Sequence, residues 1–250
     1  MGEALKEKGW LDVTETQSTL TDLYALGSAP FVLESINPGL TLTKEQQHAC
    51  EKIDAGSKQF NAYLLEGITG SGKTEVYLQT IANVLQRGEK ALVLVPEIGL
   101  TPQTVSRFTD RFEAPVFVYH SGLTEKQRAK TWLETRHTGP CVVIGTRSAL
   151  FSPCTDLGLI ILDEEHDSSF KQQEGFRYSA RDLAIMRAKQ ENIPVVLGSA
   201  TPSLESIYNV KQGRYQHCQL THRANQAATL PTISCVDLRL GKASQGIAPV

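Results

Sequence analysis

The chain has 250 residues, with 25 Lys and Arg against 27 Asp and Glu, which leaves a formal net charge of -2. Its 40% hydrophobic and 21% charged residues are typical of a globular protein with a sizeable core, and its length suits one large α/β domain with appendages. The near-neutral balance excludes nucleic-acid binding through a basic tail but leaves room for a local positive groove. No apolar run reaches the roughly 18 residues of a membrane-spanning helix, and the N-terminus shows no signal-peptide pattern. We therefore expect a cytoplasmic protein with no membrane partner.

Short apolar runs alternate with amphipathic stretches along most of the chain. In chain order, the runs predict strands at residues 62–65, 91–95, 116–119, 141–144, 159–162 and 194–197. The stretches around them predict helices at residues 44–54, 74–86, 101–112, 125–136, 180–190 and 204–212. Two weaker strands are expected near Cys218 and Ile233. Because most runs are continuous Val, Ile and Leu, the strands should be buried on both faces of a parallel sheet.

The same pattern divides the chain into three segments. Residues 1–38 are expected to form an N-terminal linker, for which the tail of a winged-helix domain is one interpretation. Residues 39–213 should form the α/β domain. Residues 214–250 should hold the end of that domain and a linker toward a further one, because strand and helix signals thin out there. The chain looks cut at both ends.

A glycine-rich stretch lies between the first predicted strand and a helix. It matches the phosphate-binding pattern G-x-x-x-x-G-K-[ST] at every fixed position, in the context that the pattern needs. Its backbone N–H groups can face phosphate, Lys73 adds a charge at the β- and γ-phosphates, and the Thr74 hydroxyl can ligate Mg²⁺. The predicted nucleotide-binding residues are Gly67, Ile68, Thr69, Gly70, Ser71, Gly72, Lys73 and Thr74.

Three acidic residues and a histidine follow the apolar run at 159–162, namely Asp163, Glu164, Glu165 and His166. Ligands of open parallel sheets bind at the carboxyl ends of the strands, so this acidic motif should face the phosphate loop. Asp163 is expected to hold Mg²⁺, directly or through water, and Glu164 to polarise the attacking water. Lys73, Asp163 and Glu164 are therefore the predicted catalytic residues.

Together the two motifs resemble the superfamily-two helicases, whose first RecA-like lobe carries both. Five further stretches fall where other motifs of that lobe belong, at residues 42–46, 96–103, 145–149, 167–178 and 198–202. They make the chain similar to the PriA family of primosomal replication-restart helicases over roughly residues 40–240. The resemblance implies a RecA-like P-loop domain with a parallel β-sheet flanked by helices on both faces. It also implies that Gln46 reads the adenine of ATP.

DNA contacts follow from the resemblance and from the residue types. Small hydroxyl side chains and an arginine at strand and helix ends suit a phosphate backbone, while a Ser and a Thr after the last strand are expected to link nucleotide state to DNA. The residues expected to contact DNA or couple it to hydrolysis are Thr101, Gln103, Thr146, Arg147, Phe170, Lys171, Phe176, Arg177, Tyr178, Ser199 and Thr201.

An aromatic and basic segment directly after the acidic motif is the main candidate for coupling. Phe170, Phe176 and Tyr178 alternate with Lys171 and Arg177 in a stretch that looks too polar for a strand. Aromatic faces stack on unpaired bases at roughly 1–3 kcal/mol each, and basic side chains neutralise phosphate. Such a loop would let DNA binding stimulate hydrolysis. The alternative is that these aromatic side chains cover the core of the domain.

The family resemblance implies a DNA helicase that uses ATP and Mg²⁺, moves 3′ to 5′ and restarts replication at stalled or collapsed forks. The implied partners are single-stranded and forked DNA, single-strand-binding protein and primosome assembly proteins at the nucleoid. Two alternatives remain: another superfamily-two repair helicase, or a nucleotide-dependent DNA-binding switch without productive hydrolysis. Glu164 argues against the switch, which has no need of a water-polarising carboxylate.

The resemblance also implies parts that we do not expect to find within this chain. One is an N-terminal fork-binding domain, and another is a second RecA-like lobe. An arginine finger of the kind that the second lobe supplies contributes on the order of 10³–10⁵ in rate, so the chain alone should be nearly inactive. A cysteine-rich zinc insertion belongs to that second lobe, in agreement with five scattered cysteines that form no C-x-x-C pair.

Overall fold

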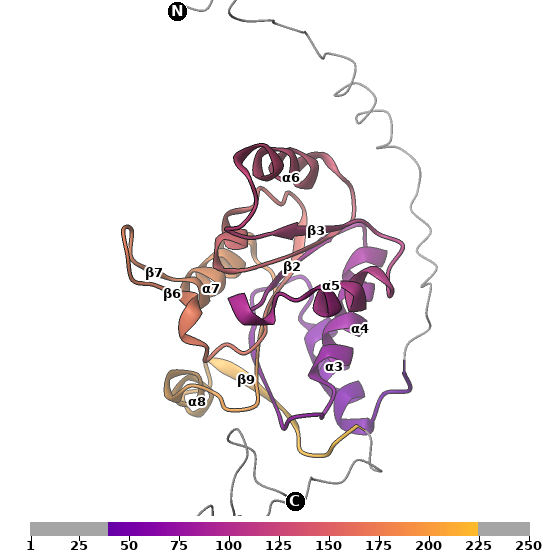
Figure 1. Cartoon of the computed structure of the whole chain (residues 1–250). Coiled ribbons are helices and arrows are strands. Elements are labelled where there is room, and N and C mark those ends of the chain that lie inside the picture. The colour runs from indigo at the N-terminus through magenta and orange to yellow at the C-terminus, as the bar shows by residue number, and fades with distance from the viewer. Residues whose placement is uncertain (1–39, 225–250) are drawn as a thin grey trace, which may run out of the picture.

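The computed structural model describes residues 40–224 (Figure 1). The predicted N-terminal linker at 1–38 and the weak strand predicted near Ile233 lie outside the described residues. One sheet contains β1 (Ala62–Gly67), β2 (Lys90–Leu94), β3 (Val116–Tyr119), β4 (Val142–Gly145), β5 (Leu157–Leu162), β8 (Val195–Ser199) and β9 (Tyr215–Leu220). Its order is β3-β4-β2-β5-β8-β1-β9, and all neighbouring pairs are parallel. The predicted parallel α/β fold is confirmed.

Helices connect these strands and cover the sheet. They are α3 (Lys44–Ala55), α4 (Lys73–Gln86), α5 (Pro102–Thr109), α6 (Glu125–His137), α7 (Ala180–Glu191) and α8 (Leu204–Lys211). Side-chain caps fix where several of them begin: Thr43 and Thr124 each form a capping box, and Ser179 accepts from the Asp182 N–H. Short 3₁₀ turns at η1 (Glu97–Gly99), η2 (Arg147–Phe151) and η3 (Ser168–Phe170) complete the domain. No helix within residues 40–224 is long and apolar enough to cross a membrane.

Apolar side chains of the central strands point alternately to two cores, one on each face of the sheet. On β1, Tyr63 and Leu65 pack into the core that α3, α4 and α5 contribute to. Ala62 and Leu64 pack into the opposite core, together with side chains of α7 and η2. All four are at most 2% exposed. Burial on both faces explains why these strands read as continuous apolar runs.

The strand order brings three carboxyl ends together. β8 lies between β1 and β5, so the phosphate loop, the acidic motif and the residues after Ser199 meet at one edge of the sheet. This edge is where open α/β sheets bind ligands. β9, the strand expected near Cys218, pairs with β1 on its other side and lies within the segment 214–250.

The chain beyond β9 is held beside the phosphate loop. The Glu45 carboxylate accepts from the Thr221 N–H at 2.8 Å and from the His222 N–H at 3.3 Å. The Thr221 hydroxyl is the main cause that lowers the pKa of Glu45 to about 2. Further along, the Ala224 N–H donates to the Gly70 carbonyl at 3.0 Å. The segment from 221 to 224 therefore lies against both α3 and the phosphate loop.

The segment after the acidic motif is not the strand-free loop that its polarity predicted. It forms a short antiparallel hairpin of β6 (Lys171–Gln172) and β7 (Tyr178–Ser179), which projects from the domain (Figure 1). Two residues pair from each strand, which requires backbone hydrogen bonds but no apolar pattern. Gly175, with φ of 68°, lies between the two strands. We call residues 171–179 the aromatic hairpin.

Candidate nucleotide-binding and DNA-coupling site

The phosphate loop makes the turn from β1 into α4. Gly70 and Gly72 have φ of 80° and 82°, a left-handed backbone that glycine adopts without a Cβ penalty. The Lys73 ammonium donates to the Gly67 carbonyl at 3.0 Å and lies 3.8 Å from Glu164 Oε1. Ser71 Oγ is buried and has no hydrogen-bond partner within residues 40–224. An orphaned buried hydroxyl in such a loop fits a bound phosphate.

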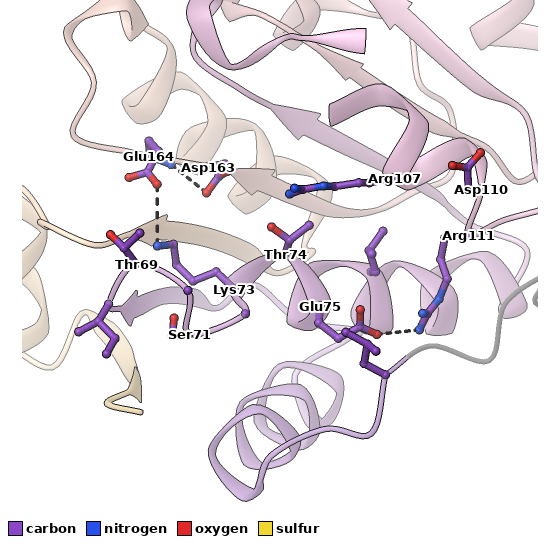
Figure 2. A pocket seen from close by; sticks show the side chains of 15 residues that line it. Thr69, Ser71, Lys73, Thr74, Glu75, Arg107, Asp110, Arg111, Asp163 and Glu164 are labelled. Carbon is purple, nitrogen blue, oxygen red and sulfur yellow. Dashed lines mark hydrogen bonds and ion pairs between the residues drawn. The ribbon is translucent and has the colours of Figure 1, made fainter. Parts of the chain in front are cut away.

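A cavity of about 630 Å³ lies against this loop (Figure 2). Its volume is within the range of roughly 300–1,000 Å³ that is typical of small-molecule sites. The predicted residues that line it come from both motifs: Ile68, Thr69, Gly70, Ser71, Gly72, Lys73, Thr74, Asp163 and Glu164. The structure therefore brings the phosphate loop and the acidic motif onto one cavity, whereas Gly67 and Gln46 are outside its lining.

Asp163 is a partly buried carboxylate at the end of β5. Its Oδ1 accepts from the Tyr77 hydroxyl at 2.9 Å and from the Glu164 N–H at 3.1 Å. Burial raises the pKa of Asp163, and the Tyr77 hydrogen bond opposes that rise. Burial also raises the pKa of Tyr77 well above its usual range, so this phenol stays a hydrogen-bond donor. Thr74 lines the same cavity.

The donor set fits magnesium. Mg²⁺ prefers oxygen ligands and is usually held by one or two protein oxygens together with substrate phosphates. The Asp163 carboxylate and the Thr74 hydroxyl can provide those protein oxygens, both on the cavity that contains Lys73. Within residues 40–224 no group of three or more His, Cys, Asp or Glu side chains forms a metal cage, and none is needed for this mode of binding.

Glu164 lies where the chain passes from one neighbouring strand to the other. The Asp163 N–H bonds to Leu94 of β2, and the Glu165 N–H bonds to Gly198 of β8. Between them Glu164 has φ of 48°, a left-handed conformation that non-glycine residues seldom adopt. Such conformations cluster at functional sites. The turn directs the half-exposed Glu164 side chain toward Lys73 (Figure 2).

Glu165 has a structural role. Its buried carboxylate accepts from the Ser203 N–H at 2.7 Å and pairs with the Arg181 guanidinium at 3.2 Å. These contacts join the acidic motif to α7 and to the beginning of α8. The carboxylate faces away from the nucleotide cavity, whose lining it does not join.

Replacement of Glu165 by Ala should therefore lower stability. It leaves Arg181, whose side chain is only 12% exposed, without its buried partner, and breaking a buried pair costs about 3 kcal/mol. Equilibrium unfolding in urea measures the loss. Glu205→Ala is the matched control, because Glu205 faces the same Arg181 at 3.9 Å but is largely exposed, and little change is expected. Equal losses for both variants would contradict a structural role for Glu165.

His166 links the acidic motif to the residues after β8. Its Nδ1 is 2.7 Å from Ser199 Oγ and its Nε2 is 3.3 Å from Thr201 Oγ1. His166 Nδ1 also lies 3.6 Å from Glu164 Oε2. Ser199 is fully buried, which excludes direct contact with DNA and leaves it a linking role. A chain of contacts thus runs from the predicted base to Thr201 on the surface.

Gln46 is buried next to the phosphate loop. Its Oε1 accepts from the Thr43 N–H and its Nε2 donates to the Ser71 carbonyl, both at 2.8 Å. Adenine reading by Gln46 stays a prediction. It requires the amide to leave Ser71 or to use its second Nε2 proton.

The cavity also has a wall that sequence patterns did not reveal. Arg107 of α5, together with Asp110 and Arg111 directly after it, lines the cavity opposite the phosphate loop (Figure 2). Arg111 forms a buried pair with Glu75 at 2.9 Å, while the exposed Arg107 makes no ion pair within residues 40–224. Only tertiary packing brings these residues to the phosphate loop, so no local motif could have identified them. Arg107 is free to contact a nucleotide.

The predicted DNA-stacking aromatics separate into two kinds. Phe170 is only 2% exposed and packs in the core with α7, so the expectation that it stacks on DNA is wrong, and the alternative of core packing holds for it.

Phe176 is 81% exposed at the tip of the aromatic hairpin. The rings of Tyr178 and Phe176 have centroids 6.1 Å apart, and Phe151 meets Tyr178 edge-on at 5.3 Å. Phe151, which sequence analysis did not select, thus extends the aromatic surface. Lys171 and Arg177 are exposed on the same hairpin.

Arg147 differs from the expected phosphate-gripping side chain. Its guanidinium donates to the Ser169 carbonyl at 2.9 Å and to the Lys171 carbonyl at 3.3 Å, and lies 3.9 Å from Glu97. These contacts tie η2 to the base of the aromatic hairpin. Because three acceptors share the guanidinium, Arg147 acts here as an anchor of the hairpin.

A second cavity of about 520 Å³ contains other residues of the predicted DNA interface. Thr101, at the N-cap of α5, and Thr146, after β4, both line it. His120 and Ser121, which follow β3 and were not predicted, line it as well. Gln103 is exposed but is not part of this lining. Of the residues predicted to contact DNA after β2 and β4, Thr101 and Thr146 therefore lie together in this lining, whereas Gln103 and Arg147 do not.

Comparison with known proteins agrees with this site. Residues 43–210 match the family model of the DEAD/DEAH box helicases, which is most of the domain described above. The chain therefore belongs to the DEAD/DEAH box helicase family, whose members use ATP and Mg²⁺.

Within that family, the similar relatives are replication restart proteins. The chain is 52% identical over 228 residues to the replication restart protein PriA of Haemophilus influenzae, covering 91% of this chain and 31% of the relative. It is 49% identical over 202 residues to that of Bacillus subtilis, covering 80% and 25%. The resemblance noted from the motifs is confirmed, and the chain spans about a third or less of these relatives' length. RecG bound to a three-way DNA junction shares the fold, with a TM-score of 0.55 at 23% identity, over 85% of this chain and 27% of that one.

Proposed function

We propose that this chain is the ATP-binding first lobe of a DNA helicase that moves 3′ to 5′ and restarts replication at stalled or collapsed forks. The observation that carries the proposal is the single cavity shared by Lys73, Thr74, Asp163 and Glu164. Its relatives are named replication restart proteins, which supports a role in replication restart. A second lobe with an arginine finger and a zinc insertion, primosome proteins, single-strand-binding protein and a place at the nucleoid in the cytoplasm belong to the same proposal.

Each cavity residue has a defined task in ATP hydrolysis. Lys73 neutralises charge on the β- and γ-phosphates, and the N–H groups at the start of α4 bind their oxygens. Thr74 and Asp163 would hold magnesium, which when bound would offset the negative charge that develops on the phosphates. Glu164 takes the proton of the attacking water, for which its place 3.8 Å from Lys73 is suited.

A nucleotide-dependent DNA-binding switch is the competing function. A switch needs the phosphate loop but gains nothing from a carboxylate held in a left-handed turn beside it. Glu164 therefore favours hydrolysis. Strand displacement by the full-length protein on forked DNA tests the helicase proposal: unwinding should require ATP and proceed only from a 3′ single-stranded tail. Equal unwinding from a 5′ tail would contradict the proposed polarity, and none from either would contradict the helicase itself.

Coupling between DNA and hydrolysis is proposed to run through the aromatic hairpin. Its tip carries Phe176 in solvent, its base is tied to η2 by Arg147, and η3 connects it to the acidic motif. A base stacked on Phe176 would shift the hairpin, and η3 would transmit that shift to Glu164. A change of about 1 Å at a catalytic group alters rates by on the order of 100-fold.

Phe176→Ala in the full-length protein should separate coupling from nucleotide binding. Affinity for single-stranded DNA should fall about fivefold or more, because one stacked base contributes roughly 1–3 kcal/mol. ATP turnover at saturating DNA should fall about tenfold, which is less than the roughly 100-fold loss of rate that a displacement of about 1 Å can cause. ATP affinity should stay unchanged. Since Phe176 is 81% exposed, the fold should tolerate the change. Tyr208→Ala, which removes an exposed aromatic ring from α8, is the control. Wild-type turnover by Phe176→Ala at saturating DNA would refute the coupling role.

A further inference from the structure

Tyr77 connects the phosphate-loop helix to the acidic motif. It lies four residues after Lys73 on α4, so the two side chains project from the same side of the helix. The ring is 2% exposed, and its hydroxyl donates to Asp163 Oδ1 at 2.9 Å. Nothing in the phosphate-binding sequence pattern calls for a tyrosine at this position.

The hydrogen bonds of Asp163 are unevenly distributed. Within residues 40–224, both of them, from Tyr77 and from the Glu164 N–H, fall on Oδ1. Oδ2 is therefore the oxygen left for a metal ion or its bound water. With Oδ1 fixed from two sides, the carboxylate plane cannot rotate freely, and Oδ2 keeps one direction relative to the cavity.

Gly198 provides the space that the Tyr77 hydroxyl occupies. A Cβ atom built on Gly198 would overlap the hydroxyl oxygen of Tyr77. Gly198 lies in β8, and its carbonyl accepts from the Glu165 N–H in the acidic motif. Elements α4, β5 and β8 thus meet at a single phenol oxygen. Any larger residue at 198 would push this oxygen away from Asp163.

A buried hydroxyl needs a hydrogen-bond partner in any case, so Tyr77 could be a purely structural residue. The chain offers a matched example of that case. Tyr63 is buried in the same core, its hydroxyl donates to the Lys52 carbonyl at 3.1 Å, and a Cβ on Gly56 would overlap it. Within the described part of the chain, that hydroxyl donates no hydrogen bond to a residue that lines the nucleotide cavity. The two tyrosines differ in the acceptor of their hydroxyl group, which is the Asp163 carboxylate for Tyr77 and a backbone carbonyl for Tyr63.

We propose that Tyr77 is a positioning residue for magnesium: its hydroxyl orients the Asp163 carboxylate, and Gly198 keeps the space for it. The inference rests on the proposed function, in which Asp163 holds the magnesium ion that accompanies ATP. Hydrogen bonds to a ligating carboxylate tune metal sites, and their loss typically costs 10–100-fold in metal affinity or activity.

The test compares Tyr77→Phe with Tyr63→Phe in the full-length protein. Affinity for ATP is measured by calorimetry in EDTA and at a series of magnesium concentrations, with ATP turnover and thermal unfolding recorded in parallel. Tyr77→Phe should bind ATP like the wild type in EDTA but need about 10–100-fold more Mg²⁺ for the metal-dependent gain in affinity. Tyr63→Phe should show the wild-type magnesium dependence.

The outcomes separate this inference from the function on which it rests. If Tyr77→Phe keeps the wild-type magnesium dependence, or if Tyr63→Phe shifts equally, Tyr77 is structural only and the inference is wrong. If the wild type itself shows no magnesium-dependent ATP binding, the proposed function fails, and the inference with it.

Gly198 gives an independent check. Gly198→Ala should raise the magnesium requirement like Tyr77→Phe, because its methyl group displaces the same hydroxyl. The double variant Tyr77→Phe/Gly198→Ala should then need little more Mg²⁺ than either single variant, since both changes act on one contact. If the Mg²⁺ requirement of the double variant rose by the product of the two single-variant increases, the two residues would act separately. That result would overturn the proposed role of Gly198.

Discussion

The Glu164→Gln variant of the full-length protein should bind ATP like the wild type. Its rate of ATP hydrolysis should be lower by about 100-fold or more. Glutamine keeps the shape of the side chain and its place in the left-handed turn, but it cannot accept the proton of the attacking water. A general base contributes on the order of 10²–10⁴ to rate, which sets the expected loss. ATP affinity by calorimetry and phosphate release with saturating DNA measure the two effects separately.

Glu205→Gln is the control for that experiment, because Glu205 is an exposed carboxylate outside the cavity. It should keep wild-type turnover. If Glu164→Gln retained more than half of the wild-type rate, Glu164 would not be the base. A large loss of ATP affinity in this variant would instead assign Glu164 to nucleotide binding.

Lys73→Ala should abolish measurable ATP binding. Hydrogen bonds to charged groups contribute about 1.5–3 kcal/mol each, so losing the contacts to two phosphates lowers affinity by about 100-fold or more. The apolar core should remain intact, because among residues 40–224 the polar contacts of the Lys73 ammonium are with the Gly67 carbonyl and Glu164. Calorimetric titration with ATP gives the affinity, and circular dichroism checks the fold.

Lys211→Ala, which removes an exposed lysine at the end of α8, is the matched control and should bind ATP normally. ATP binding by Lys73→Ala at near wild-type affinity would mean that the nucleotide lies elsewhere than against the phosphate loop.

The sequence predicted those features that local chemistry determines. Continuous apolar runs such as 159–162 indicated buried parallel strands, since both faces of the sheet are covered. The phosphate loop was recognisable because its glycines, Lys73 and Thr74 must follow one another in a fixed order around a phosphate. The acidic motif followed from its place after a strand of the same sheet.

Features that depend on packing between distant segments were not predictable. Phe170 and Phe176 are the same residue type six positions apart, yet η3 turns one into the core and the hairpin exposes the other. The anchoring contacts of Arg147 and the approach of Arg107 to the phosphate loop depend on tertiary packing alone. Strands β6 and β7 were missed because their backbone pairing leaves no apolar signature.

The proposed function requires that this lobe, as part of the full-length protein, hydrolyse ATP in response to DNA. The most direct measurement is phosphate release by that protein with and without saturating single-stranded DNA, for the wild type and Phe176→Ala. DNA should strongly stimulate turnover by the wild type and stimulate turnover by the variant far less. ATP binding without turnover, or turnover equally fast without DNA, would show that this lobe is not a DNA-stimulated ATPase.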